Sequence, residues 1–320
     1  QQVQDIVVRK NIALPNALKK AVVFYGVRRS GKTFILFDLF KKYLDCALYI
    51  DFEDERLTEF DVGDFERLRE AFLELKPELI GKELVFFIDE VQNIEGWERF
   101  CRRAVERENI RVFVTGSSSK MMPQEIHTEL RGRAWGIEVL PFSFMEYLDA
   151  KGMAIKERDA YGPKKAAIKK HFYDYMKWGG FPEVAYLGSD IERMKLLREY
   201  LGAMFFRDLV ERYNITNITL LDALTDRLFS SFSLKFTPSS FYKQYKDKFP
   251  FSKDLLFRYC KYFLQSMLVF EVRMFAESTY KRMRNPAKLY LVDTGLCKRV
   301  SSADAGRLLE NVVYLELRRR

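Results

Sequence analysis

Short apolar runs, rich in β-branched and aromatic residues, alternate with amphipathic stretches over the first half of the chain. The runs predict strands at 21–25, 47–52, 84–89, 110–115 and 135–140. Most of the intervals between them carry the spacing of helices. Strands that are apolar on both faces and alternate with helices are typical of a parallel sheet covered on both sides. The sequence therefore predicts an α/β fold for this half.

Helical spacing dominates the second half. Residues 164–177 predict a helix that ends in the turn Trp178-Gly179-Gly180-Phe181-Pro182, which together resemble a small helical lid. Residues 190–232 carry long helical periodicity, interrupted near 214–217. No internal repeat or low-complexity segment is present, so we expect a mostly helical region of ordinary globular character.

A different order of elements follows from Thr237 onward. Helices are expected at 239–248 and 253–266, separated by a turn at Pro250, and β-rich segments at 269–272 and 289–292. Two helices followed by two strands are the order of a winged helix-turn-helix. The basic stretch 280–286 is then the wing or the loop before the second strand.

The segment Gly26-Val27-Arg28-Arg29-Ser30-Gly31-Lys32-Thr33 fits the pattern G-x-x-x-x-G-K-[ST] between an expected strand and an expected helix. Glycines let the backbone N–H groups of such a loop face phosphates, and the N-terminus of the helix adds positive potential. Lys32 would reach the β- and γ-phosphates, and Thr33 would offer a hydroxyl to Mg²⁺. We therefore expect a nucleoside triphosphate site that uses Gly26, Arg29, Ser30, Gly31, Lys32 and Thr33.

The apolar run 84–88 ends in Asp89-Glu90. A parallel strand delivers such residues to the carboxyl edge of the sheet, beside the phosphate loop. We expect Asp89 to hold the Mg²⁺ shell and Glu90 to orient or deprotonate the attacking water.

The next strand ends in Thr115-Gly116-Ser117-Ser118-Ser119. Ser117 is our candidate for a sensor of the γ-phosphate, although the same serines would also serve a turn and a helix N-cap. Arg131 and Arg133 are candidates for a guanidinium that stabilises the transferred phosphoryl group, with Arg133 preferred. An ion pair within the chain is the alternative for these two arginines.

Together these motifs resemble a known family. Its marks are the loop 26–33, Phe87-Ile88-Asp89-Glu90-Val91-Gln92, the segment 115–119, Arg131-Gly132-Arg133, residues 140–147, Trp178-Gly179-Gly180-Phe181-Pro182-Glu183, Phe206-Arg207-Asp208-Leu209, residues 288–296 and Leu309-Glu310-Asn311-Val312-Val313-Tyr314. The set is similar to archaeal and bacterial AAA+ ATPases that carry a C-terminal domain of unknown function, a DUF4143-like winged-helix region.

The resemblance implies a P-loop AAA+ core at 1–150, a helical lid at 151–189, a helical and winged-helix domain at 190–300, and the start of a further domain at 301–320. It also implies ATP hydrolysis with Mg²⁺, a homo-oligomer with an arginine supplied in trans, and DNA as a partner. Pro182 resembles a residue that packs on adenine in related ATPases, although an ordinary tight turn would also explain it. Many relatives continue into a fold similar to PD-(D/E)XK nucleases, whereas this sequence stops at Arg320, so we expect truncation or disorder there and infer no nuclease activity.

The net charge of +9 is concentrated in one stretch. Residues 235–299 contain 14 Lys and Arg against 5 Asp and Glu, so this stretch alone accounts for the excess. Such asymmetry favours a polyanion partner. Most of its aromatic residues are expected in the core, and its cations on the surface, where they would contact phosphates without reading bases. A solvated basic face without a ligand is the alternative. The candidates for DNA binding are Lys243, Lys246, Lys253, Arg258, Lys281, Arg282 and Arg284.

The remaining composition excludes some classes of protein. No apolar run has the length of a membrane span, and the first residues do not resemble a signal peptide, so we expect a cytoplasmic protein without a membrane partner. Four scattered cysteines and two histidines argue against a zinc site. Besides a DNA-binding ATPase, an ATP-dependent signalling or defence switch and a protein remodeller fit the same residues.

Overall fold

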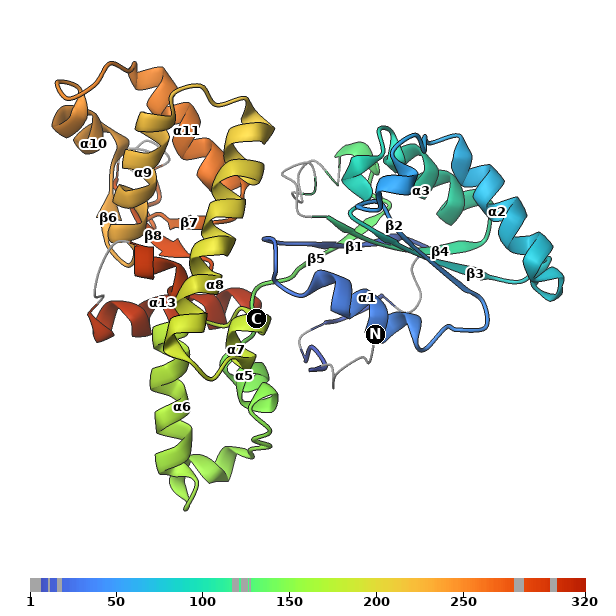
Figure 1. Ribbon diagram of the computed structural model, residues 1–320, viewed down its shortest axis with the longest axis horizontal. Coiled ribbons are helices and arrows are strands. Elements are labelled where there is room, and N and C mark those ends of the chain that lie inside the picture. Colours follow the sequence, from blue (N-terminus) through green and yellow to red (C-terminus); the bar gives the residue numbers. More distant parts are fainter. Residues whose placement is uncertain are drawn as a thin grey trace. The chain divides into compact units, whose positions relative to one another are not determined.

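The computed structural model describes residues 7–10, 12–15, 19–116, 121, 126, 128–278, 285–299 and 304–320. The chain forms two compact units (Figure 1). The first comprises residues 1–26 and 31–139, and the second comprises residues 27–30 and 140–320.

The first unit is a five-stranded sheet in the order β2-β3-β4-β1-β5, with every neighbouring pair parallel. The strands are β1 Ala21–Tyr25, β2 Ala47–Asp51, β3 Leu84–Asp89, β4 Ile110–Gly116 and β5 Ala134–Glu138. The helices are α1 Lys32–Phe40, α2 Asp64–Leu75 and α3 Trp97–Arg107, with short 3₁₀ turns η1 Glu55–Leu57, η2 Pro77–Leu79 and η3 Val91–Asn93. The predicted fold class, a parallel α/β sheet followed by a mostly helical region, is confirmed.

Alternation along the strands explains the two layers of helices. In β1, Val22 and Phe24 pack in the cluster that contains Leu36 of α1, whereas Val23 packs in the cluster that contains Phe100 of α3. Figure 1 shows α1 on one face of the sheet and α2 and α3 on the other. Both faces are thus buried, as the two-sided apolar runs require.

The register of the sheet sets which strand ends meet. Asp51 pairs with Asp89, Ile88 pairs with Val114, and Tyr25 pairs with Gly116. The last residues of β1, β3 and β4 therefore lie along one edge, where open parallel sheets bind ligands.

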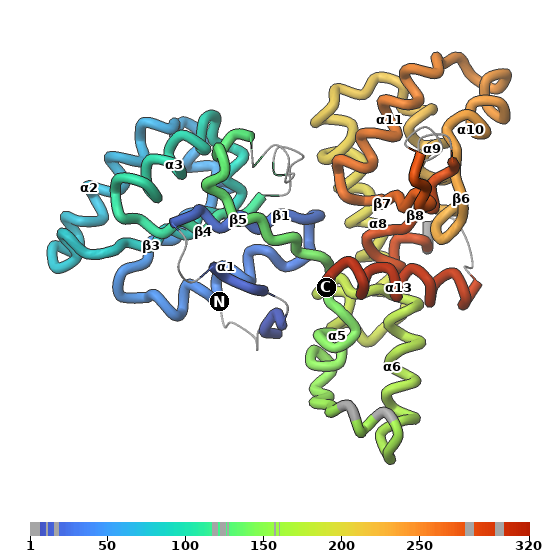
Figure 2. Tube along the Cα trace, turned by 180° about the vertical axis from the view of Figure 1, so that it is seen from behind, coloured from blue at the N-terminus to red at the C-terminus, as the bar shows by residue number. Residues whose placement is uncertain are grey.

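The second unit is mostly helical. Its elements are α5 Phe144–Ala150, η5 Glu157–Tyr161, α6 Lys165–Trp178, α7 Pro182–Tyr186, α8 Asp190–Ala203, the π-helical segment η6 Met204–Glu211, α9 Ile218–Ser230, β6 Lys235–Phe236, α10 Pro238–Tyr245, α11 Lys253–Gln265, β7 Val269–Val272, β8 Ala287–Leu291, η7 Thr294–Arg299 and α13 Ala305–Arg319. The strands β6, β8 and β7 form a small antiparallel sheet in that order. Helix α13 contacts α6 and β8, and Figures 1 and 2 show it lying across one end of α6.

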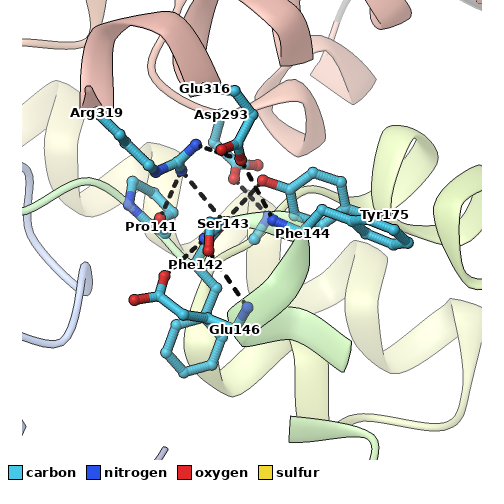
Figure 3. A network of polar contacts seen from close by, with 10 residues as sticks. Pro141, Phe142, Ser143, Phe144, Glu146, Tyr175, Asp293, Glu316 and Arg319 are labelled. Carbon is cyan, nitrogen blue, oxygen red and sulfur yellow. Dashed lines mark hydrogen bonds and ion pairs between the residues drawn. The ribbon is translucent and has the colours of Figure 1, made fainter. Parts of the chain in front are cut away.

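A buried polar network ties α13 to the segment that precedes α5 (Figure 3). The Nη2 atom of Arg319 donates to the carbonyl oxygens of Pro141 (2.8 Å) and Phe142 (3.2 Å). The hydroxyl of Tyr175, on α6, donates to the same Phe142 oxygen at 2.7 Å, and the Phe142 N–H donates to the carbonyl oxygen of Gly180 at 2.7 Å. Two helices distant in sequence thus hold one short segment.

Asp293 holds the neighbouring glycine turn. Its carboxylate is buried and accepts hydrogen bonds from the N–H groups of Gly180 (2.6 Å) and Gly295 (2.7 Å). Gly179 has a φ of 79°, and a Cβ there would overlap the Asp293 carboxylate, so only glycine fits. Burial raises the pKa of Asp293 to about 7, because desolvation of the charge outweighs the two N–H donors and the nearby Arg319 guanidinium.

The raised pKa predicts that Asp293 makes stability depend on pH. The folded protein holds the Asp293 proton more tightly than the unfolded chain, in which the pKa of this group is about 4. The raised pKa therefore adds to the free energy of unfolding in full below about pH 4, and this stabilisation is lost as pH rises through about 7. Asp293→Asn stays neutral. We expect the free energy of unfolding of the wild type, minus that of the variant, to fall between pH 5 and pH 8 in urea titrations. A difference that stays constant over this range would contradict the assignment.

Candidate nucleotide site

The loop 26–33 curls at the end of β1, as its glycines predict. Gly31 has a φ of 93° and precedes the first residue of α1, so the helix N-terminus opens into the loop. Lys32 is buried, and its Nζ donates to the carbonyl oxygen of Gly26 at 3.1 Å. Ser30 is also buried, and Arg29 has a φ of 64°; both belong to the segment 27–30 that is grouped with the second unit.

Asp89 is the buried acid at this edge of the sheet. It ends β3 with 2% of its surface exposed, and Thr33 and Thr115 both donate a hydroxyl hydrogen bond to its carboxylate. The Tyr49 hydroxyl, from β2, donates to Oδ2 at 3.1 Å. The loop and the strand end predicted to converge are therefore joined by the bond between Thr33 and Asp89.

Burial controls the electrostatics of this carboxylate. Desolvation raises the pKa of Asp89 above its usual value, against the lowering effect of its hydroxyl donors and with the added repulsion of Glu90 and Asp51. The pKa of Tyr49 is raised as well, mainly by burial and then by the charge of Asp89. A cation beside Asp89 would offset the cost of keeping this carboxylate charged.

Glu90 follows in a left-handed conformation, with φ 48° and ψ 44°. This conformation is uncommon outside glycine and asparagine, and it turns the chain sharply after β3. The Glu90 N–H donates to the Thr115 hydroxyl at 3.1 Å, and the Gln92 side-chain amide donates to the Glu90 carboxylate. Thr115 thus contacts both acids of the pair.

Sequence reasoning missed Tyr49, Thr115 and Gln92 as site residues. Thr115 begins the hydroxyl-rich segment after β4, from which the sequence favours Ser117 instead. Ser117 lies outside the described residues. A polar residue one position before the strand end was the available signal for Thr115.

The two candidate arginines lie in the turn before β5. The Arg133 guanidinium forms an ion pair with Glu106 of α3, and its Nη1 donates to the carbonyl oxygen of Arg131 at 3.1 Å. Arg131 is exposed, with a φ of 48°. The ion pair within the chain that the sequence left open is therefore formed by Arg133.

The remaining predicted residues lie in the second unit. Pro182 begins α7, directly after the turn that Asp293 holds. Lys243, Lys246, Lys253 and Arg258 are exposed on or beside α10 and α11. Lys281, Arg282 and Arg284 lie outside the described residues.

Over the part of the chain that the structure describes, no cluster of three or more His, Cys, Asp or Glu residues has the arrangement of a metal site. No helix in the same part combines the length and the apolar character that crossing a membrane requires.

Comparison with known proteins agrees with this geometry. The family described as "AAA domain" matches residues 18–148, and a domain of unknown function, DUF8612, matches residues 169–307 in place of the DUF4143-like region expected. The solved Walker-type ATPase PABY2304 of Pyrococcus abyssi aligns with a TM-score of 0.55 and 15% identity, over 88% of this chain and 91% of that one. At this identity the likeness shows the fold alone.

Two longer relatives match along most of the sequence. A Haemophilus influenzae protein is 26% identical over 93% of this chain and 74% of its own length. The protein MJ1544 of Methanocaldococcus jannaschii is 36% identical over 96% of this chain and 68% of its own length. The chain therefore belongs to the family of MJ1544, and its first half is a P-loop AAA-type ATPase domain.

Proposed function

We propose that the site hydrolyses ATP with Mg²⁺. The observation that carries this proposal is the hydrogen bond between Thr33 of the loop and Asp89 of β3, since it unites the two halves of a phosphate and metal site. A hydroxyl and a carboxylate are hard oxygen ligands of the kind Mg²⁺ takes, so these residues fit the ion. Bound there, Mg²⁺ would neutralise charge on the β- and γ-phosphates.

The chain's own residues would do the rest. The N-terminus of α1 and Lys32 would bind the phosphates, with Lys32 exchanging its bond to Gly26 for phosphate oxygens. Asp89 and Thr33 would hold the ion directly or through water. Glu90, at the same edge, would orient the attacking water and accept its proton.

Two substitutions separate binding from hydrolysis. Lys32→Ala should weaken nucleotide binding roughly tenfold or more, because it removes a charged donor to phosphate. Glu90→Gln should leave binding intact and lower kcat about 100-fold or more, because an amide cannot take the proton. Fluorescent-nucleotide titration and phosphate release measure the two effects, with Glu95→Gln, an exposed acid of the same segment, as control. Wild-type turnover in Glu90→Gln would refute the proposed role.

We also propose that an arginine acts in trans within a homo-oligomer, with Arg133 preferred over Arg131. Arg133 is half-exposed and forms its ion pair with Glu106 at the surface. If that ion pair opened, the guanidinium could reach the nucleotide of a neighbouring subunit. Arg131 is the exposed alternative in the same turn.

Mixing experiments test this role. Arg133→Ala alone should lose activity about 1,000-fold or more, in keeping with the usual value of such arginines. Mixing it with inactive Glu90→Gln should restore hydrolysis, since an intact Glu90 in one subunit then meets an intact Arg133 from its neighbour. Full activity of Arg133→Ala alone would rule out its role and leave Arg131 to be tested in the same way.

DNA is the partner that we propose for the second unit. The order α9, β6, α10, α11, β7 and β8, with the sheet order β6-β8-β7, supports the proposal of a winged helix. Phe241, Tyr259 and Phe263 are buried, so aromatic residues fill the core of these helices while lysines face solvent. Lys248 and Lys253 lie over the rings of Tyr245 and Tyr242, at 4.7 and 5.2 Å. Such exposed cations support contacts with phosphates rather than with bases.

Removal of three of these cations should weaken DNA binding. The triple variant of Lys243, Lys246 and Lys253 to Ala should bind duplex DNA more weakly at low salt, and the slope of log affinity against log salt should fall by about 0.9 for each phosphate that the variant no longer neutralises. Fluorescence anisotropy measures both quantities. The triple variant of Lys41, Lys42 and Lys82, exposed lysines of the first unit, removes equal charge and should bind like the wild type. If the wild type does not bind DNA even at low salt, a signalling switch or a protein remodeller replaces this proposal.

A further inference from the structure

Gln92 lies two residues beyond Glu90, in the 3₁₀ turn η3 that follows β3. Its side-chain Nε2 donates a hydrogen bond to Oε2 of Glu90. Between these two side chains the backbone turns sharply, because Glu90 has a left-handed conformation. The residue proposed to act on water is therefore held by an amide of its own loop.

The Oε1 atom of Gln92 packs against Gly116, the last residue of β4. A Cβ on Gly116 would overlap Gln92 Oε1 and the Met121 side chain, so the glycine leaves the room that the amide fills. The φ of Gly116 is not in the left-handed region, and its need for glycine is therefore steric. Gln92 is thus fixed between the end of β4 and Glu90.

The hydrogen bonding of this amide is one-sided. Gln92 Oε1 is buried and accepts no hydrogen bond from any residue that the structure describes. A glutamine that served packing alone would be replaced at lower cost by an apolar side chain of the same length, since a buried oxygen without a donor is unfavourable. The hydrogen bond to Glu90 is the interaction that an apolar side chain at this position could not make.

We propose that Gln92 is a positioning residue that orients the Glu90 carboxylate towards the attacking water. A glutamate side chain has three rotatable bonds, and one donor on one oxygen restricts how the other oxygen points. Misplacement of a catalytic group by about 1 Å can cost a factor of about 100 in rate. This inference rests on the proposed hydrolysis, and it adds Gln92 as the residue that orients the proposed base, Glu90.

Two variants of similar shape test this role. Gln92→Met keeps the length and removes the donor, and Gln92→Glu keeps the shape and places a carboxylate against Glu90. Both should lower kcat by about 10- to 100-fold and leave the dissociation constant of a fluorescent ATP analogue within about twofold of the wild type. Having two variants covers the case in which one of them fails to fold, which urea unfolding would reveal.

The matched control is Asn93→Ala, in the same turn. Asn93 donates its side-chain amide to the carbonyl oxygen of Phe52 at 2.9 Å and so anchors the loop; its removal should affect stability and leave kcat within about twofold. Gly116→Ala offers an independent route, because its Cβ would displace the Gln92 amide without changing Gln92. It should lower kcat in the same way as Gln92→Met.

The outcomes are distinct. If the wild type hydrolyses ATP and Glu90→Gln does not, but both Gln92 variants turn over like the wild type, the inference fails and the proposed function stands. An increase in kcat in Gln92→Met would also overturn it, since Gln92 would then restrain Glu90 instead of preparing it. If the wild type binds ATP without hydrolysing it, the proposed function itself fails.

Discussion

The structure of the candidate site depends on keeping one charged carboxylate at a buried strand end. Asp89 is almost completely removed from water, and an isolated charge in such a place is strongly unfavourable. Hydroxyls from three separate segments, those of Thr33, Thr115 and Tyr49, converge on its two oxygens. Their donation offsets only part of the desolvation, since the pKa remains raised. The edge is thereby prepared for a cation that would complete the compensation.

Strand order and register create this convergence. β3 lies between β2 and β4, so Tyr49 and Thr115 come from the two neighbours of Asp89, and β1 on the far side of β4 supplies the loop with Thr33. Thr115 then links the two acids, because it donates to Asp89 and accepts from the Glu90 N–H. Local sequence supplies each group, and the parallel sheet brings the groups to one edge.

The motifs of the first unit could be predicted because their chemistry is local. The loop 26–33 and the acidic end of β3 each lie within a few consecutive residues, and the apolar runs set the strands to within one or two positions. Tyr49 and Gln92 could not be predicted in this way. The bond from Tyr49 depends on the β2–β3 register, and the contact of Gln92 depends on the left-handed turn at Glu90, neither of which appears in a pattern of polar and apolar residues. The two-residue strand β6 was missed because it is too short to show alternation.

We propose that Thr33 and Asp89 share one magnesium ion with a bound triphosphate. The affinity for ATP with Mg²⁺ and with EDTA, measured in the wild type, Thr33→Ala and Asp89→Asn by isothermal titration calorimetry, tests this proposal most directly. We predict that Mg²⁺ tightens binding to the wild type and that each substitution removes most of this gain. An equal Mg²⁺ effect in all three proteins would contradict the claim.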